Sequence, residues 1–410
     1  MRYFILLLLS LGISLLGFAQ EKAVSLDNAI KLALEKNPTI QASTMETARQ
    51  QELKKSSVDI PKTEVSFMYG QFNSIQKNDN NITITQNIPF PTVFSAQSSL
   101  NKELVNSAIL KESVTKNELT FQVKQIFNQL VYLKEHQQVL LQHDSLLTDL
   151  ARAASVQYKT GESTLLAKTS ADTQLMEIKN QIARNEADIR IALNHLQILC
   201  QSAQINDIDG NQETLFSLDE TNSSFDQNPS LALVSQNIEV SRRIKKLEVS
   251  RTLPDLSVGY FNQTLIGTQN VNGIDQYFGP SERFQGLQFG VFIPLWIGSH
   301  TARIKAANIQ SNIAEKQKEA FQLSIAQQYN QASEELLKNK NSLQYYRDSA
   351  LETAILLTEQ SRKAFKSGEL DYTMLLLNLR QALSIREGYL LALQQYNNSI
   401  IIIQFLNGNK

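Results

Sequence analysis

The second half of this chain repeats the landmarks of its first half in the same order. Asn37-Pro38 and Asn228-Pro229 each precede a helical pattern. The other matched pairs are Pro61 with Pro254, Pro89 with Pro294, and Gly161 with Gly368. The spacing between partners changes only from 191 residues, at the first pair, to 207 residues at the two glycines. This repeat is much longer than the roughly 20 to 50 residues of solenoid repeats, so we interpret it as the duplication of a half-domain.

The first 19 residues have the features of a secretory signal peptide. Arg2 supplies a positive charge, residues 3–18 are apolar, and Gly17 and Ala19 are the small residues of a cleavage site, so cleavage is expected after Ala19. An uncleaved membrane anchor is the alternative, although the run is shorter than the roughly 20 residues that a spanning helix needs. No cysteine follows the run, which gives no support to a lipoprotein anchor. The single cysteine, Cys200, is expected to be a small buried apolar residue.

Four short segments alternate between apolar and polar or small residues, as half-buried strands do. We expect strands at residues 63–72, 81–89, 255–265 and 285–294. Their apolar positions are Val65, Phe67, Tyr69, Ile82, Ile84, Ile88, Leu256, Val258, Tyr260, Leu287, Phe289, Val291 and Ile293. Each run has about the nine to eleven residues that a tilted strand needs to cross a bilayer. The alternative is a pair of hairpins packed on a soluble helical core.

The connections within each strand pair favour the membrane interpretation. Residues 74–81 and 267–286 are polar, rich in Asn and Gly, and long for hairpin turns, as expected of loops that face the outside of a cell. Four strands cannot close a barrel, but three chains would contribute twelve, an even number within the range of outer-membrane barrels. The sequence therefore predicts a homotrimer whose strands, with Phe289 on the outer face, contact outer-membrane lipid.

Most of the remaining sequence predicts very long helices, at residues 92–158, 163–200, 298–366 and 369–406. In the first of them the apolar residues follow the four-three spacing of a coiled-coil seam. These residues are Leu119, Val123, Ile126, Leu130, Leu133, Leu140 and Leu147. The fourth has a similar stripe at Leu379, Leu383, Leu390 and Leu393. A periplasmic coiled-coil scaffold that never inserts into a membrane is the alternative interpretation.

These elements predict a mainly α fold with a small β part. The first structural repeat covers residues 20–202 and the second covers residues 227–410, with a linker at residues 203–226. Each repeat contains a helix, two strands and two long antiparallel helices.

Enzyme chemistry has no support in the sequence. The four histidines are not grouped with Cys, Asp or Glu at the spacing of metal ligands, and no phosphate-binding glycine loop or nucleophilic serine motif is present. We therefore predict no catalytic residue, no cofactor and no metal site. The 39 basic and 40 acidic residues are spread along the chain, which gives no indication of nucleic-acid binding.

The order of these landmarks resembles that of TolC-family outer-membrane efflux proteins. The resemblance rests on residues 26–38, on Pro61 before the first strand, on the Ile-Pro junctions at Pro89 and Pro294, and on the two glycine turns. It implies a trimer in which a twelve-stranded transmembrane β-barrel continues into a periplasmic α-helical tunnel. It also implies two partners: a periplasmic adaptor, or membrane fusion protein, and an inner-membrane pump.

The same resemblance assigns roles to the turns between the long helices. It implies that the adaptor contacts the tips at Lys159, Thr160, Gly161 and Glu162 and at Lys366, Ser367, Gly368 and Glu369. Some relatives carry aspartates shortly after the second tip, but this chain has Met374 and Leu377 there. Asp371, with these two residues, is the candidate lining of the tunnel mouth. A helix N-terminal acid, stabilised by the helix dipole, explains Asp371 equally well.

The resemblance leaves the coupled pump open. Channels of this family serve efflux with a resistance-nodulation-division (RND) pump and type I protein secretion with an ABC exporter. The chain is closest in type to the CusC- and CzcC-like group, so efflux of metal ions or small toxic compounds is the leading interpretation.

Overall fold

A computed structural model describes most of the chain. The described residues are 23–73, 75–210, 216 and 224–408. The predicted signal peptide, residues 1–19, lies outside them, as do residues 211–215 and 217–223 of the predicted linker.

The chain divides into two compact units, each formed by segments that are distant in sequence. The hairpin unit comprises the described residues of Met1–Ala42, together with Ser113–Pro229 and Leu323–Lys410. The sheet unit comprises Ser43–Glu112 and Ser230–Gln322. Each unit takes segments from both sequence repeats, so the duplication and the spatial division do not coincide.

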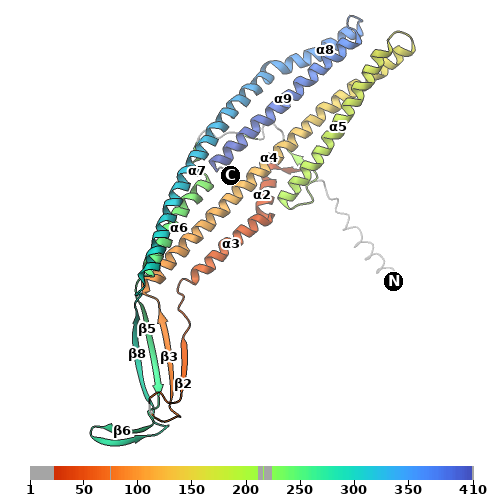
Figure 1. Cartoon of the computed structure of the whole chain (residues 1–410). Helices are drawn as coiled ribbons and strands as arrows, with labels where there is room; N and C mark the ends of the chain where they lie inside the picture. The colour runs from red at the N-terminus through yellow and green to blue at the C-terminus, as the bar shows by residue number, and fades with distance from the viewer. Residues whose placement is uncertain (1–22, 74, 211–215, 217–223, 409–410) are drawn as a thin grey trace, which may run out of the picture. The chain divides into compact units, whose positions relative to one another are not determined.

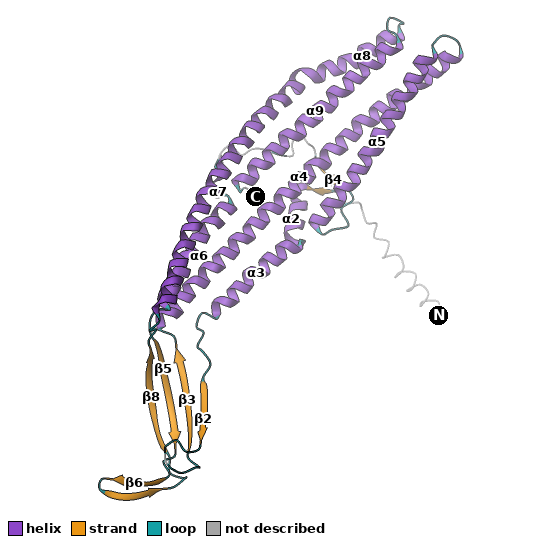
Figure 2. Cartoon of the chain, in the orientation of Figure 1, coloured by secondary structure: helices purple, strands orange, loops and turns teal. Residues whose placement is uncertain are grey.

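Helices dominate the structure, as Figures 1 and 2 show. Their bounds are α2 (Leu26–Lys36), α3 (Pro38–Lys55), α4 (Pro91–Lys159), α5 (Leu165–Cys200), α6 (Pro229–Ser250), α7 (Ile297–Tyr345), α8 (Leu351–Lys366) and α9 (Tyr372–Asn407). None of the helices in the described ranges combines the length and the apolar character needed to cross a membrane.

In each repeat, a buried asparagine near the beginning donates a hydrogen bond to the end of the last helix. Asn37 ends α2 and precedes Pro38, which begins α3; its side chain donates to the carbonyl of Leu199, in the last turn of α5, at 3.0 Å. Asn228 precedes Pro229 at the start of α6, and its side chain donates to the carbonyl of Leu406, in the last turn of α9, at 2.9 Å. The last carbonyls of a helix have no partner within that helix, and each asparagine supplies one.

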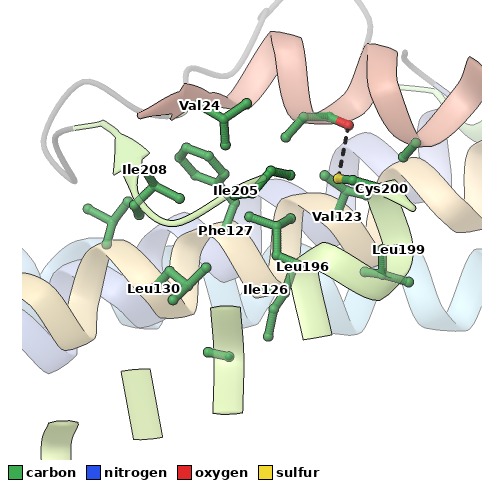
Figure 3. Packing of buried hydrophobic residues seen from close by; sticks show 14 of the residues in the cluster. Val24, Val123, Ile126, Phe127, Leu130, Leu196, Leu199, Cys200, Ile205 and Ile208 are labelled. Carbon is green, nitrogen blue, oxygen red and sulfur yellow. Dashed lines mark hydrogen bonds between the residues drawn. The ribbon is translucent and has the colours of Figure 1, made fainter. Parts of the chain in front are cut away.

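The core of the hairpin unit lies where α2, α4 and α5 meet (Figure 3). Phe127 and Leu130 of α4 and Leu196 of α5 are fully buried there. Cys200 is buried in the same cluster, and its thiol donates to the carbonyl of Ala29 in α2 at 3.4 Å. Burial raises the pKa of this thiol to about 11, so it stays protonated at neutral pH. The expectation that Cys200 is a small buried residue is confirmed.

The predicted seam of α4 is buried along its whole length. All seven of its residues, from Leu119 to Leu147, have exposed fractions below 9%. Beyond the core at α2, the seam continues in a second cluster in which Leu140 and Leu147 pack with Ile178 of α5. The four-three spacing therefore identified the face of α4 that packs against other helices, and this prediction is confirmed.

The sheet unit contains one antiparallel sheet in the strand order β2-β3-β5-β8. Its strands are β2 (Glu64–Tyr69), β3 (Asn80–Ile88), β5 (Asp255–Gln263) and β8 (Phe284–Phe292). They occupy the four stretches in which apolar and polar residues alternate. β3 pairs with β5, so the sheet joins a hairpin from each sequence repeat. In the hairpin unit, β1 (Val24–Ser25) pairs in parallel with β4 (Ile208–Asp209), which lies within the predicted linker.

The expectation of a loop over residues 267–286 is wrong. β6 (Gly267–Val271) and β7 (Ile274–Phe278) form an additional hairpin there. Asn272 and Gly273 connect the two strands with φ angles of 54° and 87°. A two-residue turn with both φ angles positive matches the right-handed twist of paired strands, and Asn-Gly is its preferred sequence.

The expected helix over residues 298–366 is present in the structure, but it is not α-helical throughout. A π-helical segment, Tyr346–Ala350, separates α7 from α8. Tyr346 lies against Gly388 of α9, where a Cβ atom would be 2.5 Å from the tyrosine hydroxyl. Short π-helical segments interrupt longer helices and often occur at functional positions.

We expect Asn37→Ala and Asn228→Ala each to lower the free energy of unfolding by about 1 to 3 kcal/mol, because each leaves a helix-end carbonyl without its donor. Thermal melting of the purified protein would measure this. Asn180→Ala, at an exposed position in the middle of α5, is the matched control and should change stability by less than about 0.5 kcal/mol. Equal effects of all three substitutions would contradict the closing role of the two asparagines.

Candidate functional site: helix-hairpin turns and an exposed strand face

Two parts of the structure hold the residues that the sequence singled out. The first is the pair of turns that connect α4 to α5 and α8 to α9, and the second is one face of the sheet. The turns belong to the hairpin unit and the face to the sheet unit.

The turn between α4 and α5 reverses the chain at a glycine. Gly161 has a φ of 77°, which a residue with a side chain adopts only at a cost, and its N–H donates to the carbonyl of Tyr158 at 3.2 Å. The next two N–H groups, of Glu162 and Ser163, both donate to the carbonyl of Gln157, at 2.8 and 3.1 Å. The Thr164 hydroxyl then accepts from the N–H of Ala167 and caps α5.

The turn between α8 and α9 repeats this arrangement bond for bond. Gly368 has a φ of 79°, and its N–H donates to the carbonyl of Phe365 at 3.2 Å. The N–H groups of Glu369 and Leu370 donate to the carbonyl of Ala364, at 2.9 and 3.2 Å. Each donor and acceptor lies 207 positions after its counterpart in the first turn. The duplication seen in the sequence therefore extends to the individual hydrogen bonds of the two turns.

The tip residues are all exposed, and both turns lie at the same end of the hairpin unit (Figure 2). They are Lys159, Thr160, Gly161 and Glu162 in the first turn and Lys366, Ser367, Gly368 and Glu369 in the second. Each turn thus presents one lysine and one glutamate beside its glycine, in a position to contact another protein.

Asp371 is the N-cap of α9. Its side chain accepts from the N–H of Met374 at 2.7 Å, just as Thr164 accepts from Ala167 at the start of α5. A side-chain acceptor at this position satisfies an N–H group that has no partner within the helix. Met374 and Leu377 have exposed side chains in the first turns of α9. The cap explains Asp371 on structural grounds, and a role for these residues at a tunnel mouth stays a prediction.

A small apolar cluster joins the two hairpins below their turns. Ala151, Ala154 and Ala171 of the first hairpin pack with Tyr372 of the second. The Tyr372 ring meets Phe365 edge-on, with the ring centroids 5.9 Å apart. Small residues on the first hairpin leave room for the two aromatic rings of the second.

The hydroxyl of Tyr372 is buried and has no hydrogen-bond partner in the described part of the chain. Burial, followed by the negative charge of Asp172, raises the pKa of Tyr372 to about 12. The phenol therefore stays neutral.

The second part of the site is the apolar face of the sheet. Directly paired residues of adjacent strands point to the same face, so the register shows which side chains share it. One row across the sheet is Val65, Ile84, Tyr260 and Leu287; the next two are Gln86, Val258 and Phe289, and Ile88, Leu256 and Val291. Phe289 has an exposed fraction of 75%, the highest in these rows. The alternation in the sequence therefore predicted which face of the strands is mainly apolar, and this prediction is confirmed; Gln86, Asn262 and Gln285 are polar positions on that face.

The opposite face is mainly polar, with several small residues. Its rows include Glu64, Thr85, Gly259 and Gln288, and also Asn87, Ser257 and Gly290. Within the described chain, β2 pairs only with β3 and β8 pairs only with β5, so the sheet has two open edges. Because the strands alternate in direction along the order β2-β3-β5-β8, the two edge strands run in opposite directions.

In the described residues, no three side chains of His, Cys, Asp or Glu lie close enough together to hold a metal ion.

No protein-family model and no curated protein matches the sequence. Solved structures do match it. The outer-membrane channel OprN superposes with a TM-score of 0.76 at 14% identity, over 94% of this chain and 90% of OprN. CusC superposes with a TM-score of 0.76 at 14% identity, over 94% of this chain and 92% of CusC. The outer membrane protein VceC of Vibrio cholerae gives 0.76 at 11% identity, over 93% of this chain and 96% of VceC.

This chain has the fold of these outer-membrane channels. The likeness covers nearly the full length of both chains in each comparison, so both halves of the duplication take part in it. The resemblance to the TolC family is confirmed at the level of the fold. At 11% to 14% identity the likeness concerns the course of the backbone, and the roles of individual side chains have to be argued from this chain.

Two features of this chain were not predicted from its sequence. The hairpin β6–β7 had a usable signal, because Asn272-Gly273 is flanked by Val271 and Ile274. The sequence also carried a signal for the equivalent caps Thr164 and Asp371. Both residue types are frequent N-caps, and both lie three residues after a turn glycine.

We expect Tyr372→Phe to raise the free energy of unfolding by about 1 kcal/mol, because it removes a buried hydroxyl that has no partner in the chain. Thermal melting would measure the change. Tyr345→Phe, at an exposed position, is the matched control and should have an effect below about 0.5 kcal/mol. A lower melting temperature for Tyr372→Phe would mean that the hydroxyl finds a partner in the assembled protein.

Proposed function

We propose that this chain is a TolC-family outer-membrane channel and acts as the passive exit duct of a tripartite efflux system. The observation that carries the proposal is the sheet: one of its faces is mainly apolar and exposed, and both of its edges are open in the described chain. The proposal places the strands in the outer membrane and the hairpin unit in the periplasm.

Three of the four strands have the length that a membrane requires, whereas β2 has six residues and is shorter than the predicted strand at residues 63–72. β3, β5 and β8 have nine residues each, within the range of tilted strands that cross a bilayer. An apolar face as extensive as that of β2, β3, β5 and β8 is rarely left in contact with water and marks an interaction site. Lipid is the partner that fits it, because one row is apolar across all four strands and most of the other side chains on this face are also apolar.

The open edges support a trimer. A sheet in the membrane has to close, because unpaired N–H and C=O groups are too costly in lipid. The edge strands β2 and β8 run in opposite directions, so β8 of one copy can pair antiparallel with β2 of the next. Three copies joined head to tail in this way would form a closed barrel of twelve strands with the polar face inside.

The helix-hairpin turns are proposed as the contact with a periplasmic adaptor. Both turns are exposed at one end of the hairpin unit, they have the same backbone geometry, and each carries a lysine and a glutamate. Two equivalent turns on each of three chains would present six similar sites to the adaptor. The pump is proposed to be of the RND type and the substrates to be metal ions or small toxic compounds; an ABC exporter that secretes a polypeptide is the alternative.

We expect the combined substitution Leu287→Asp, Phe289→Asp and Val291→Asp to prevent assembly in the membrane. Each carboxylate on the lipid-facing side should cost on the order of 2 kcal/mol or less, and the costs should add. The measurement is native mass spectrometry of the protein extracted from the outer-membrane fraction, where the unaltered protein should appear as a trimer.

The matched control places the same three charges on the polar face, with Thr83→Asp, Thr85→Asp and Gln288→Asp. This variant should still assemble, because its carboxylates face a water-filled interior. Normal assembly of the variant with charges on the apolar face would refute the barrel. A soluble periplasmic monomer or dimer of the unaltered protein would favour the coiled-coil scaffold instead.

The adaptor contact predicts a different phenotype. We expect Lys159→Glu combined with Lys366→Glu to leave the trimer and its melting temperature unchanged, because both side chains are exposed. Export should fall by ~10-fold, the effect of losing about 1.4 kcal/mol of binding free energy. Intracellular accumulation of a dye or metal ion that a channel-deletion strain fails to export would measure this.

Lys338→Glu combined with Lys340→Glu, at exposed positions of α7 away from the turns, is the matched control. It makes the same change in net charge and should leave export unaltered. Equal loss of export in both variants would argue against a contact at the turns and for a general effect of charge.

A further inference from the structure

His136 of α4 connects three helices of the hairpin unit. Its Nδ1 lies 3.0 Å from the side-chain oxygen of Asn185 in α5, and its Nε2 lies 3.2 Å from a carboxylate oxygen of Glu387 in α9. The three residues are far apart in sequence, and each belongs to a different helix. Asn185 is buried, whereas the side chains of His136 and Glu387 are 19% and 34% exposed.

The hydrogen bonds of Asn185 fix its orientation. Its amide nitrogen donates to the carbonyl of Leu133 in α4 at 2.9 Å. If the amide were reversed, its oxygen would face that carbonyl oxygen, and two acceptors would be in contact. The oxygen of Asn185 is therefore the atom that faces His136, and it can only accept.

Two acceptors consequently face the two ring nitrogens of His136. A neutral imidazole carries one N–H, so it can donate to only one of them, and its other nitrogen presents a lone pair to an oxygen. The imidazolium carries two N–H groups and can donate to Asn185 and to Glu387 at the same time. The arrangement therefore matches the protonated form of His136.

The other groups around His136 agree with a positive charge. Tyr132, one turn earlier in α4, stacks on the imidazole with the centroids 5.7 Å apart and an angle of 6° between the planes, as cations stack on aromatic rings. On α9, Arg386 is next to Glu387, but its guanidinium donates to Gln142 of α4. Among the groups that shift the pKa of His136, the only one on α5 is the neutral Asn185.

His143, one heptad after His136 in α4, responds differently. Burial, followed by the charge of Arg386, lowers the pKa of His143. The bond to Glu387 is the largest influence on His136 and raises its pKa above the ordinary 6.5; burial opposes this, and the bond to Asn185 adds to it. The surroundings thus shift the pKa values of two histidines on one helix in opposite directions.

A helix irregularity lies beside this cluster. Gly388 follows Glu387 in α9 and contacts Tyr346 of the π-helical segment between α7 and α8. Short π-helical segments of this kind often occur at functional positions.

We infer that His136, Asn185 and Glu387 form a proton-controlled clamp that fastens α9 to α4 and α5 when the imidazole carries both protons. Loss of the proton breaks one of the two bonds and releases either α5 or α9 from the histidine. The bond between Arg386 and Gln142 does not depend on this proton, so α9 would loosen rather than detach. This inference concerns the hairpin unit alone and does not depend on the proposed function.

The direction of the pH dependence follows from the raised pKa of His136. A group whose pKa is higher in the folded state than in the unfolded state contributes stability that is fully present below its unfolded pKa. That stability is lost as the pH rises through the folded value. The clamp should therefore be closed in mildly acidic solution and open in alkaline solution.

The test is a titration of the four histidines by NMR in the full-length protein in detergent, labelled with 13C at the histidine Cε1 position. The resonance of His136 is the one that His136→Gln removes. We expect its midpoint to lie above 6.5 in the unaltered protein and to fall in Glu387→Gln. Glu186→Gln, at an exposed position next to Asn185, is the matched control and should leave the midpoint unchanged.

Asn185→Asp provides an independent variant with the opposite effect. It places a second carboxylate at Nδ1, loses the bond to the Leu133 carbonyl, and should raise the midpoint of His136 above that of the unaltered protein. A midpoint of His136 below 6.5, or one that does not respond to Glu387→Gln and Asn185→Asp, would overturn the clamp.

A stability measurement tests whether the proton holds the helices together. The difference in melting temperature between the unaltered protein and Glu387→Gln should be largest at about pH 5.5 and should shrink by about pH 8.5, on either side of the ordinary imidazole pKa. A difference that stays constant over this range would mean that Glu387 stabilises the fold without the proton, and the clamp would be refuted.

Discussion

A single type of hydrogen bond closes each half of this molecule. The side chains of Asn37 and Asn228 reach the last turns of α5 and α9, respectively, and supply a donor to a carbonyl that its own helix leaves unpaired. Each bond joins the beginning of a sequence repeat to its end. The proline that follows each asparagine begins the next helix, so a single Asn-Pro pair both ends one segment and anchors it. The long hairpins and the strands between these points can then differ in detail without changing the fold.

The two repeats differ where the second has gained structure. The hairpin β6–β7 occupies the connection between β5 and β8, whereas the connection between β2 and β3 is shorter. The π-helical segment at Tyr346–Ala350 interrupts the second repeat, whereas α4 is continuous. The turns and their caps, by contrast, are equivalent in both repeats. Duplication has therefore preserved the ends of the hairpins most strictly, as expected if both turns contact similar surfaces of one partner.

The sequence predicted best those features that follow from periodicity. The four-three spacing from Leu119 to Leu147 marks the buried face of α4, and the alternation around Phe289 marks the apolar face of the sheet, because burial of a regular element follows its repeat. The π-helical segment was beyond prediction, because no local pattern marks it; its Tyr346 meets Gly388 on a helix that comes later in the chain. The link from His136 to Glu387 was equally hidden, since the two residues are 251 positions apart and no local pattern connects them.

The most prominent surface of the described chain is the apolar face of the sheet. An apolar face with two open edges is unfavourable in water, and the proposed function covers it with lipid and pairs its edges with further copies of the same chain. The helical hairpins, by contrast, are linked within the chain. Two acceptors face the ring nitrogens of His136, so in the inferred clamp one proton decides whether the histidine bonds both α5 and α9. The proposed assembly would thus act on the sheet, whereas the clamp would act within each chain.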